Sequence, residues 1–175
     1  MPQRLSLKGR ALQLLAQREH SRVELRRKLL TYANQHAQGI AKSGAGIEPA
    51  GRTLTRRLPP APEVLVEVDA LLDWLVENRH LSETRFLEAR VRTRAARLGN
   101  LRIRQELAQH GLQLDPEAEK ALNESELARA RQVWARKFDA PAGDAAGRAR
   151  QMRFLAGRGF SADVIRRLLR GDEDD

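Results

Sequence analysis

Arginine is the residue type in this chain best suited to hold a partner by charge, with 27 arginines against five lysines. Its planar guanidinium group presents a fork of donors that matches phosphate and carboxylate groups. Three groups of arginines recur at corresponding positions of expected helices, which favours an intermittent basic strip that binds phosphates or an acidic protein surface. The basic strip consists of Arg22, Arg26 and Arg27, then Arg90, Arg94, Arg97, Arg102 and Arg104, and finally Arg166 and Arg167.

The same arginines could instead form solvated helix faces with local ion pairs, such as Arg102 with Glu106. The net charge of the chain is +9 and is unevenly distributed. Residues 81–113 hold seven arginines and three glutamates, whereas residues 63–80 hold one arginine and five acidic residues. Because DNA phosphates would repel that acidic segment, two explanations fit. Either the chain binds a protein–DNA filament, which offers partners of both signs of charge, or the acidic helix packs beside a basic helix of its own domain.

The sequence lacks the residues needed for disulfides, catalysis or metal binding. The chain has no cysteine, which excludes disulfides and thiolate sites. The carboxylates form no acid–base pair in an apolar setting, and Ser21, Ser82 and Ser161 fit helix N-caps better than nucleophiles. We therefore predict no catalytic residue, no metal site and no cofactor, and a protein that is not an enzyme. Metal-ligand spacing is also absent among the histidines, which are His20, His36, His80 and His110.

Targeting signals are absent from the segments where they would be expected. Residues 1–8 contain no apolar segment of the signal-peptide type, and no apolar run approaches the ~18 residues that cross a bilayer. We expect a cytoplasmic protein without a membrane partner. Only seven residues are aromatic, which argues against a stacking platform for single-stranded bases.

Helix is the element that the composition favours, because alanine, leucine and arginine lose little side-chain freedom in a helix. Apolar residues recur at helical spacing on both sides of one break. The pattern predicts an all-α fold of about nine mostly short helices, which must pack together to be stable. Their predicted starts or N-caps lie at Leu7, Ser21, Glu63, Ser82, the residue after Gly99, Asp115, Asn123, Asp144 and Ser161.

The break falls inside the first group of helices. Ser21 and Glu24 form a predicted capping box for the second helix, which is expected to end near Ala33. Residues 35–62 contain four glycines, four prolines and no aromatic residue. Such a segment cannot bury enough surface to offset its ordering entropy, so we predict a flexible linker over 35–62.

The chain contains an internal repeat. Residues 15–21 match residues 155–161 after a shift of 140, and a shift of 78 places Ile103 on Leu25. Phe160 falls where the first copy has His20 and is expected to plug the turn between two helices. We predict three three-helix repeats at residues 1–80, 81–122 and 123–171, followed by an acidic tail at 172–175.

Four segments, in this order and spacing, resemble the RecX family of proteins that regulate the RecA recombinase. Two features depart from the family pattern: the linker interrupts the first repeat, and Arg90 stands where the family often has an aromatic residue. The matching segments are residues 18–29, 81–94, 101–107 with Gly111 and Leu112, and 158–165.

The resemblance implies tandem three-helix repeats in an elongated, curved arrangement. It also implies binding to RecA and to its filament on single-stranded DNA, in the helical groove of the filament. The implied effects are inhibition of ATP hydrolysis, strand exchange and co-protease activity in recombination, DNA repair and the SOS response. We expect a monomer, with double-stranded DNA as a further partner.

A helix-turn-helix protein that binds nucleic acid without RecA is the alternative hypothesis. Each repeat contains a helix, a turn and an arginine-rich second helix, and such readers place base-contacting side chains at the front of that helix. Arg22 with Asn100 or Arg102 could serve, but the third copy presents Ala162 and Asp163. Sequence-specific reading by all three copies is therefore not expected.

Overall fold

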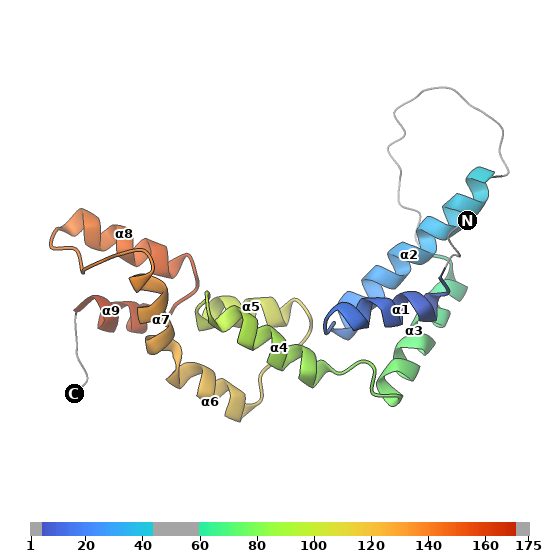
Figure 1. Cartoon of the computed structure of the whole chain (residues 1–175), viewed down its shortest axis with the longest axis horizontal. Coiled ribbons are helices and arrows are strands. Elements are labelled where there is room, and N and C mark those ends of the chain that lie inside the picture. Colours follow the sequence, from blue (N-terminus) through green and yellow to red (C-terminus); the bar gives the residue numbers. More distant parts are fainter. Residues whose placement is uncertain (1–4, 44–59, 171–175) are drawn as a thin grey trace, which may run out of the picture. The chain divides into compact units, whose positions relative to one another are not determined.

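The computed structural model describes residues 5–43 and 60–170, apart from the side chains of residues 36–43. Within those ranges it contains nine α-helices and no strand, which confirms the predicted all-α fold (Figure 1). The helices are α1 (Leu7–Gln17), α2 (Arg22–Ser43), α3 (Pro62–Glu77), α4 (Glu83–Ala95), α5 (Asn100–Ala108), α6 (Pro116–Glu124), α7 (Glu126–Ala135), α8 (Ala145–Ala156) and α9 (Ala162–Arg170).

The chain divides into two compact units, Met1–Glu83 and Thr84–Asp175. In the first unit, α1, α2 and α3 enclose one apolar core. Ser6 caps α1 by accepting a hydrogen bond from the Gly9 backbone nitrogen at 3.1 Å, and Pro62 opens α3, where a missing backbone donor costs nothing. The buried residues of this core are Ala11, Leu14, Leu25, Leu29, Val68, Leu72, Leu75 and Leu81.

The helix α2 is longer than the sequence predicts, because it continues to Ser43 instead of ending near Ala33. The first part of the predicted linker, residues 35–43, is therefore helical. A single glycine inside a helix costs only ~1 kcal/mol relative to alanine, so Gly39 is not sufficient to end one. The linker prediction for residues 44–59 lies outside the described residues, and Pro62 belongs to α3.

The second unit contains two apolar clusters, one formed by α4, α5 and α6 and the other by α7, α8 and α9. Ile103 and Leu107 of α5 are each 1% exposed in the first cluster, as their spacing predicts. Phe160 is 2% exposed in the second cluster, which confirms that it plugs the turn before α9.

The predicted N-cap at Asn123 is wrong, because α6 continues past it to Glu124 and Ser125 precedes α7. The Asn123 side chain has a different task. Its Oδ1 accepts hydrogen bonds from Asn100 Nδ2 and Arg104 Nη2, both at 2.8 Å. Asn123 therefore connects α6 to α5 instead of capping α7.

The repeat found in the sequence corresponds to a pair of helices joined by a tight turn. The second helices of these pairs begin at Arg22, Asn100 and Ala162, which are separated by the same 78 and 140 residues that relate the sequence copies. A third helix completes each core, but α3 and α6 follow their pairs whereas α7 precedes its own. The helix pairs are thus α1–α2, α4–α5 and α8–α9, and the repeat boundaries at 80, 122 and 171 stay a prediction.

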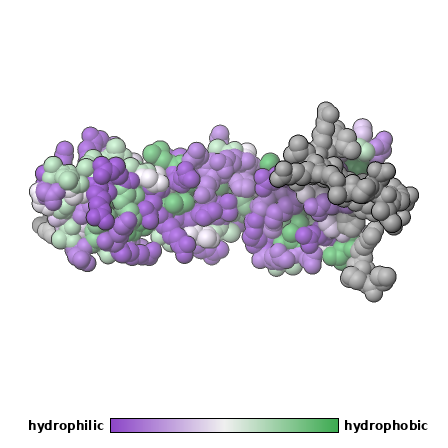
Figure 2. Space-filling model, turned by 90° about the horizontal axis from the view of Figure 1, so that it is seen from above, coloured by the Kyte–Doolittle hydropathy of each residue, from purple (hydrophilic) through white to green (hydrophobic). Residues whose placement is uncertain are grey.

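Hydrophilic residues dominate the face of the described chain that Figure 2 shows, with hydrophobic residues exposed only in small separate areas. This distribution agrees with cores that lie inside the helix groups. No helix in the described ranges has the length and apolar character needed to span a bilayer.

Candidate protein and nucleic-acid interface

Two arginines of the basic strip form ion pairs with acidic residues of the first unit. Arg22 Nη2 lies 2.7 Å from Asp73 Oδ1, and Arg26 donates two hydrogen bonds of 2.6 and 2.9 Å to the carboxylate of Asp69. The hydrogen bonds from Arg26 lower the pKa of the Asp69 carboxyl. The acidic face of α3 therefore packs beside the basic face of α2, which confirms one of the two explanations for the acidic segment.

The second group of arginines is arranged around Glu106 of α5. Arg94 Nε lies 2.8 Å and Arg90 Nε 3.6 Å from Glu106 Oε2. Because Glu106 faces the arginines of α4, the expected pair between Arg102 and Glu106 is not formed in the described structure. Arg102 donates instead to Gln105 Oε1 at 3.3 Å.

Two further arginines of the basic strip have acidic partners close in sequence or space. Arg104 pairs with Glu119 of α6, and Arg166 pairs with Asp163 of its own helix. Ion pairs between solvent-exposed groups contribute only ~0–1 kcal/mol. A phosphate or an acidic protein surface can therefore compete for these guanidinium groups.

The remaining members of the basic strip carry its most accessible charge. Arg27, Arg97 and Arg102 are exposed and form no ion pair with any described residue. Arg167 is exposed on α9. The structure thus brings Arg90 and Arg94 of α4 together at one carboxylate and distributes the other members over α2, α5, α9 and the turn after α4, which holds Arg97.

A joint inside the second unit connects the turns of the helix pairs α4–α5 and α8–α9. The Gly99 backbone nitrogen donates to the Arg158 carbonyl oxygen, and the Leu101 nitrogen donates to the Gly159 carbonyl oxygen, both at 3.0 Å. We call this contact the repeat joint. It consists of Gly99, Asn100 and Leu101 on one side, Arg158, Gly159 and Ser161 on the other, and Glu126 and Arg129 of α7.

Two glycines make this close approach possible. A methyl group on Gly99 would lie 2.2 Å from the Phe160 backbone nitrogen, and one on Gly159 would lie 2.6 Å from the Arg102 backbone nitrogen. Gly159 also has a φ of 82°, which favours glycine over residues with a side chain. From the sequence alone, Gly99 is only the residue that precedes a predicted helix start.

Glu126 is the centre of the repeat joint and is 4% exposed. One of its oxygens accepts hydrogen bonds from the backbone nitrogens of Asn100 at 2.9 Å and Ser161 at 3.3 Å, and the other accepts from Ser161 Oγ at 3.0 Å. These donors belong to the N-terminal ends of α5 and α9, where the helix dipole favours negative charge. One buried carboxylate therefore caps two helices from different pairs.

Arg129 completes the polar centre of the repeat joint from one turn further along α7. Its guanidinium donates to the carbonyl oxygens of Leu98 and Leu122, each at 2.9 Å, and to the side-chain oxygen of Asn100. Burial lowers the pKa of Arg129, whereas the charge of Glu126 raises it. No sequence motif indicates the roles of Glu126 and Arg129 in the repeat joint, because an acidic and a basic residue near a helix start are common on solvated surfaces.

The turn of the first helix pair is held by a different set of polar side chains. Ser21 Oγ accepts from the Glu24 backbone nitrogen at 3.1 Å, which confirms the predicted capping contact. The Glu24 carboxylate, 8% exposed, pairs with Arg18 at 3.1 Å and with Lys28 at 3.4 Å. Burial alone would raise the pKa of Glu24, but the hydrogen bond and charge of Arg18, with the charges of His20 and Lys28, lower it to about 2.

His20 fills the centre of that turn and is 1% exposed. Its Nδ1 lies 2.9 Å from the Arg18 carbonyl oxygen, and its Nε2 lies 3.0 Å from Lys28 Nζ. A neutral ring protonated at Nδ1 satisfies both contacts, because Nδ1–H donates to the carbonyl and Nε2 accepts from the ammonium. Burial lowers the pKa of His20, against the backbone hydrogen bond to Arg18, which raises it.

The structure contradicts the base-contacting role considered for Asn100. This residue is 1% exposed, and its backbone nitrogen is bound by Glu126. Asn100 therefore faces the repeat joint, where a DNA base cannot reach it, whereas Arg102, two residues further along α5, is exposed. Among the described residues there is also no group of three side chains that could hold a metal ion.

Comparisons with known proteins match the parts of the chain that the repeat joint connects. Residues 82–115 match a family model described as the second three-helix domain of RecX, and residues 124–169 match that of the third. The regulatory protein RecX of Ralstonia nicotianae is 43% identical over 171 residues, covering 97% of this chain and 89% of that protein. This chain belongs to the RecX family. The RecX of Herminiimonas arsenicoxydans is 42% identical over 173 residues, covering 98% and 95%, and that of Pseudomonas syringae pv. tomato is 41% identical over 177 residues, covering 98% and 94%.

Membership of the RecX family confirms the resemblance seen in the four sequence segments. The first family match ends before α6 and covers the pair α4–α5, and the second covers α7, α8 and α9. The near-complete coverage of the RecX relatives also includes the first helix pair and α3.

Proposed function

We propose that this RecX-family chain is a non-enzymatic, monomeric regulator that binds RecA and RecA filaments on single-stranded DNA in the cytoplasm. Binding lowers ATP hydrolysis, strand exchange and co-protease activity, and so limits recombination, DNA repair and the SOS response. The observation that carries this proposal is similarity over nearly the whole chain to proteins named regulatory protein RecX.

The repeat joint supports a mechanism based on occupancy. Backbone hydrogen bonds and the Glu126 carboxylate hold two helix pairs together, so the exposed Arg97, Arg102 and Arg167 keep fixed relative positions. A stiff element that bridges neighbouring RecA protomers favours the filament conformation it fits. It can shift the filament only through a difference in affinity between the conformations.

The charge distribution supports a basic surface as the contacting one. Two of the acids of α3, Asp69 and Asp73, pair with Arg26 and Arg22 within the first unit, and Glu106 pairs with two arginines of α4. The exposed and unpaired cations of the described chain remain available for acidic protein groups or DNA phosphates.

A pull-down with RecA, with and without single-stranded DNA, tests the proposal. We expect capture in both conditions and more capture on the assembled filament. The informative variant is R97Q/R102Q, because neither arginine supports an internal ion pair, and the matched control is R150Q/R153Q, which removes two exposed charges from α8. Equal capture of the two variants would show that Arg97 and Arg102 do not contribute to the interface, and no capture of the wild-type chain would refute the proposal.

Nucleic-acid binding that acts without RecA is the second candidate function, favoured by the exposed Arg27, Arg97 and Arg102. It predicts a steep dependence of DNA binding on salt. If R97Q/R102Q loses RecA binding while DNA binding survives, these arginines form a protein interface. If DNA binding is lost while RecA binding survives, the second candidate is favoured.

A further inference from the structure

The side of α3 that faces away from the core of the first unit carries exposed apolar residues. Val66 is 70% exposed and Val76 is 46% exposed, and among the described side chains no other helix exposes two large apolar residues. Ala70, one turn after Val66, is exposed as well. The helix itself does not need valine at these positions, because alanine or a charged residue favours helix more strongly. The apolar residues on this side of α3 are therefore available to a partner.

Three acidic residues lie among these apolar ones. Each is three or seven positions from Val66 or Ala70, a spacing that brings residues to one side of a helix. All three are exposed, and none forms an ion pair with a described residue. We call this surface the outer face of α3, and it consists of Val66, Ala70 and Val76 with Glu63, Glu67 and Glu77.

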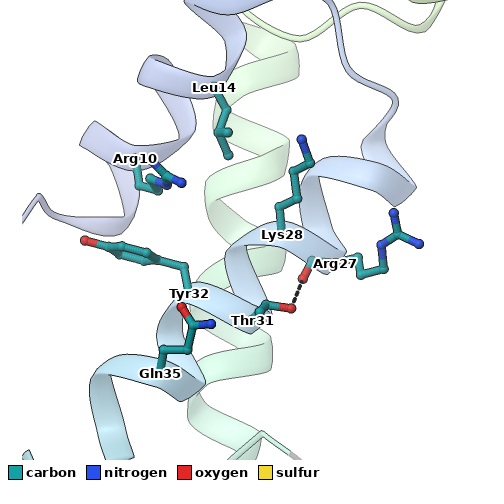
Figure 3. A pocket seen from close by; sticks show the side chains of 7 residues that line it. All are labelled: Arg10, Leu14, Arg27, Lys28, Thr31, Tyr32 and Gln35. Carbon is teal, nitrogen blue, oxygen red and sulfur yellow. Dashed lines mark hydrogen bonds between the residues drawn. The ribbon is translucent and has the colours of Figure 1, made fainter. Parts of the chain in front are cut away.

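The basic residues of the first unit leave the outer face of α3 unneutralised. Asp69 and Asp73, which pair with α2, are not part of it. Arg10 and Arg27 line a pocket of about 520 Å³ between α1 and α2, shown in Figure 3, whose lining contains no residue of α3. The packing of α3 beside α2 thus explains two of the five acidic residues of α3 and leaves three for a partner.

The charge of the outer face of α3 indicates which kind of partner fits it. Three carboxylates would repel DNA phosphates, so a nucleic acid does not fit. A protein surface rich in lysine and arginine is complementary in charge, and apolar residues surrounded by polar ones are the usual arrangement of a protein interface.

We propose that the outer face of α3 docks on a basic patch of the RecA protein itself, with Val66 at the centre of the contact. The inference deepens the proposed function and rests on it for the identity of the partner. It assigns to the chain a second contact surface, opposite in charge to the basic strip and specific for protein.

Binding of the full chain to immobilised RecA without DNA tests the inference, because phosphates then take no part. We expect E63Q/E67Q/E77Q to raise Kd about tenfold at low salt, since three exposed ion pairs each contribute a little. This difference should shrink at high salt, where such pairs are screened. Val66→Ala is expected to raise Kd about fivefold at either salt concentration, because it removes apolar contact but no charge.

Matched variants separate the outer face of α3 from net charge and from exposed apolar surface in general. E88Q/E117Q/D139N removes three exposed acidic residues from the second unit, and Val23→Ala shortens a valine of α2 that is 52% exposed. Each control should change Kd less than about twofold. Circular dichroism verifies that every variant is folded, and alanine at position 66 favours the helix.

The outcomes distinguish the occupants of this surface. Equal effects of the outer-face variants and their controls would overturn the inference. Weaker binding of oligothymidine by E63Q/E67Q/E77Q would overturn it in favour of a nucleic acid, and loss in that variant of a dimer seen by sedimentation would overturn it in favour of a second copy of the chain. RecA binding that the outer-face variants leave intact would contradict only this inference, whereas absence of binding by the wild-type chain would contradict the proposed function as well.

Discussion

The turns of the first and third helix pairs place equivalent residues in unlike surroundings. In the first turn, His20 is enclosed by Arg18, Glu24 and Lys28, and polar contacts fix the chain. In the third turn, Phe160 occupies the equivalent place in an apolar cluster. The same helix geometry is therefore stabilised by a titratable cluster at one end of the chain and by apolar packing at the other.

The difference extends to what each turn contacts. The third turn carries Gly159 and Ser161, which let it meet Gly99 and share the Glu126 carboxylate with α5. The first turn has Glu19 in place of Gly159. A few residues of the turn thus decide whether a helix pair forms a rigid joint with its neighbour or a separate pH-sensitive element.

Replacing Glu126 by alanine is expected to give the largest effect, a loss of ~3–5 kcal/mol in the unfolding free energy of the second unit. The change removes the cap of two helices and leaves the half-buried Arg129 without its acidic neighbour. Urea unfolding followed by Trp134 fluorescence in a W74F background measures this unit. Glu124→Ala, which removes an exposed pair with Lys120, should cost less than ~0.5 kcal/mol, and equal losses would contradict the role of Glu126.

Gly99→Ala is expected to cost ~2–4 kcal/mol in the same assay, because the added methyl would clash with the backbone of Phe160. Gly143→Ala is the matched control, since a methyl group there meets nothing within 4 Å. If both variants unfold at the same urea concentration, the close approach at the repeat joint is not required for stability.

His20→Phe, which installs the residue of the third turn, is expected to flatten the pH dependence of the first unit. The pKa of His20 is lowered from 6.5 in the folded chain, so its unfolded form binds a proton first. Its contribution to stability is present above about pH 6.5 and is lost as the pH falls through the folded pKa. Unfolding followed by Trp74 fluorescence in a W134F background between pH 8 and 5 measures this, and the prediction is wrong if the wild-type and His20→Phe profiles are parallel.

Asp73→Asn is expected to have the smallest effect, about 0.5 kcal/mol or less in the first unit, because its pair with Arg22 is largely exposed. The loss should vanish at high salt, where surface charges are screened. Unfolding of the W134F chain at low and high salt measures it. A loss that persists at high salt would show that the Asp73 contact is more than a surface ion pair.

The helices could be predicted from the sequence because their apolar spacing and caps are local signals. Ser6, Asp115 and Asp144 cap their helices through side-chain hydrogen bonds as short-range rules require, although the end of α2 at Ser43 and the cap at Asn123 were misplaced. The first error arises because one glycine does not stop a helix, and the second because Asn123 is used in a contact with α5.

The repeat joint could not be predicted, because it depends on residues distant in sequence. Asn100 and Glu126 each look like ordinary polar residues at a helix start, and only tertiary packing buries them. Likewise, the sequence does not show which arginines of the basic strip have acidic partners. Only the residues that lie near them in space distinguish Arg26, which pairs with Asp69, from Arg27, which forms no ion pair with a described residue.

The rate of ATP hydrolysis by RecA on single-stranded DNA, measured as this chain is added, tests the proposed regulation most directly. The account predicts that the rate falls with increasing chain and reaches a low plateau once the filament is saturated, and that Gly99→Ala weakens the inhibition. An unchanged rate at concentrations where the pull-down shows saturated binding would contradict it.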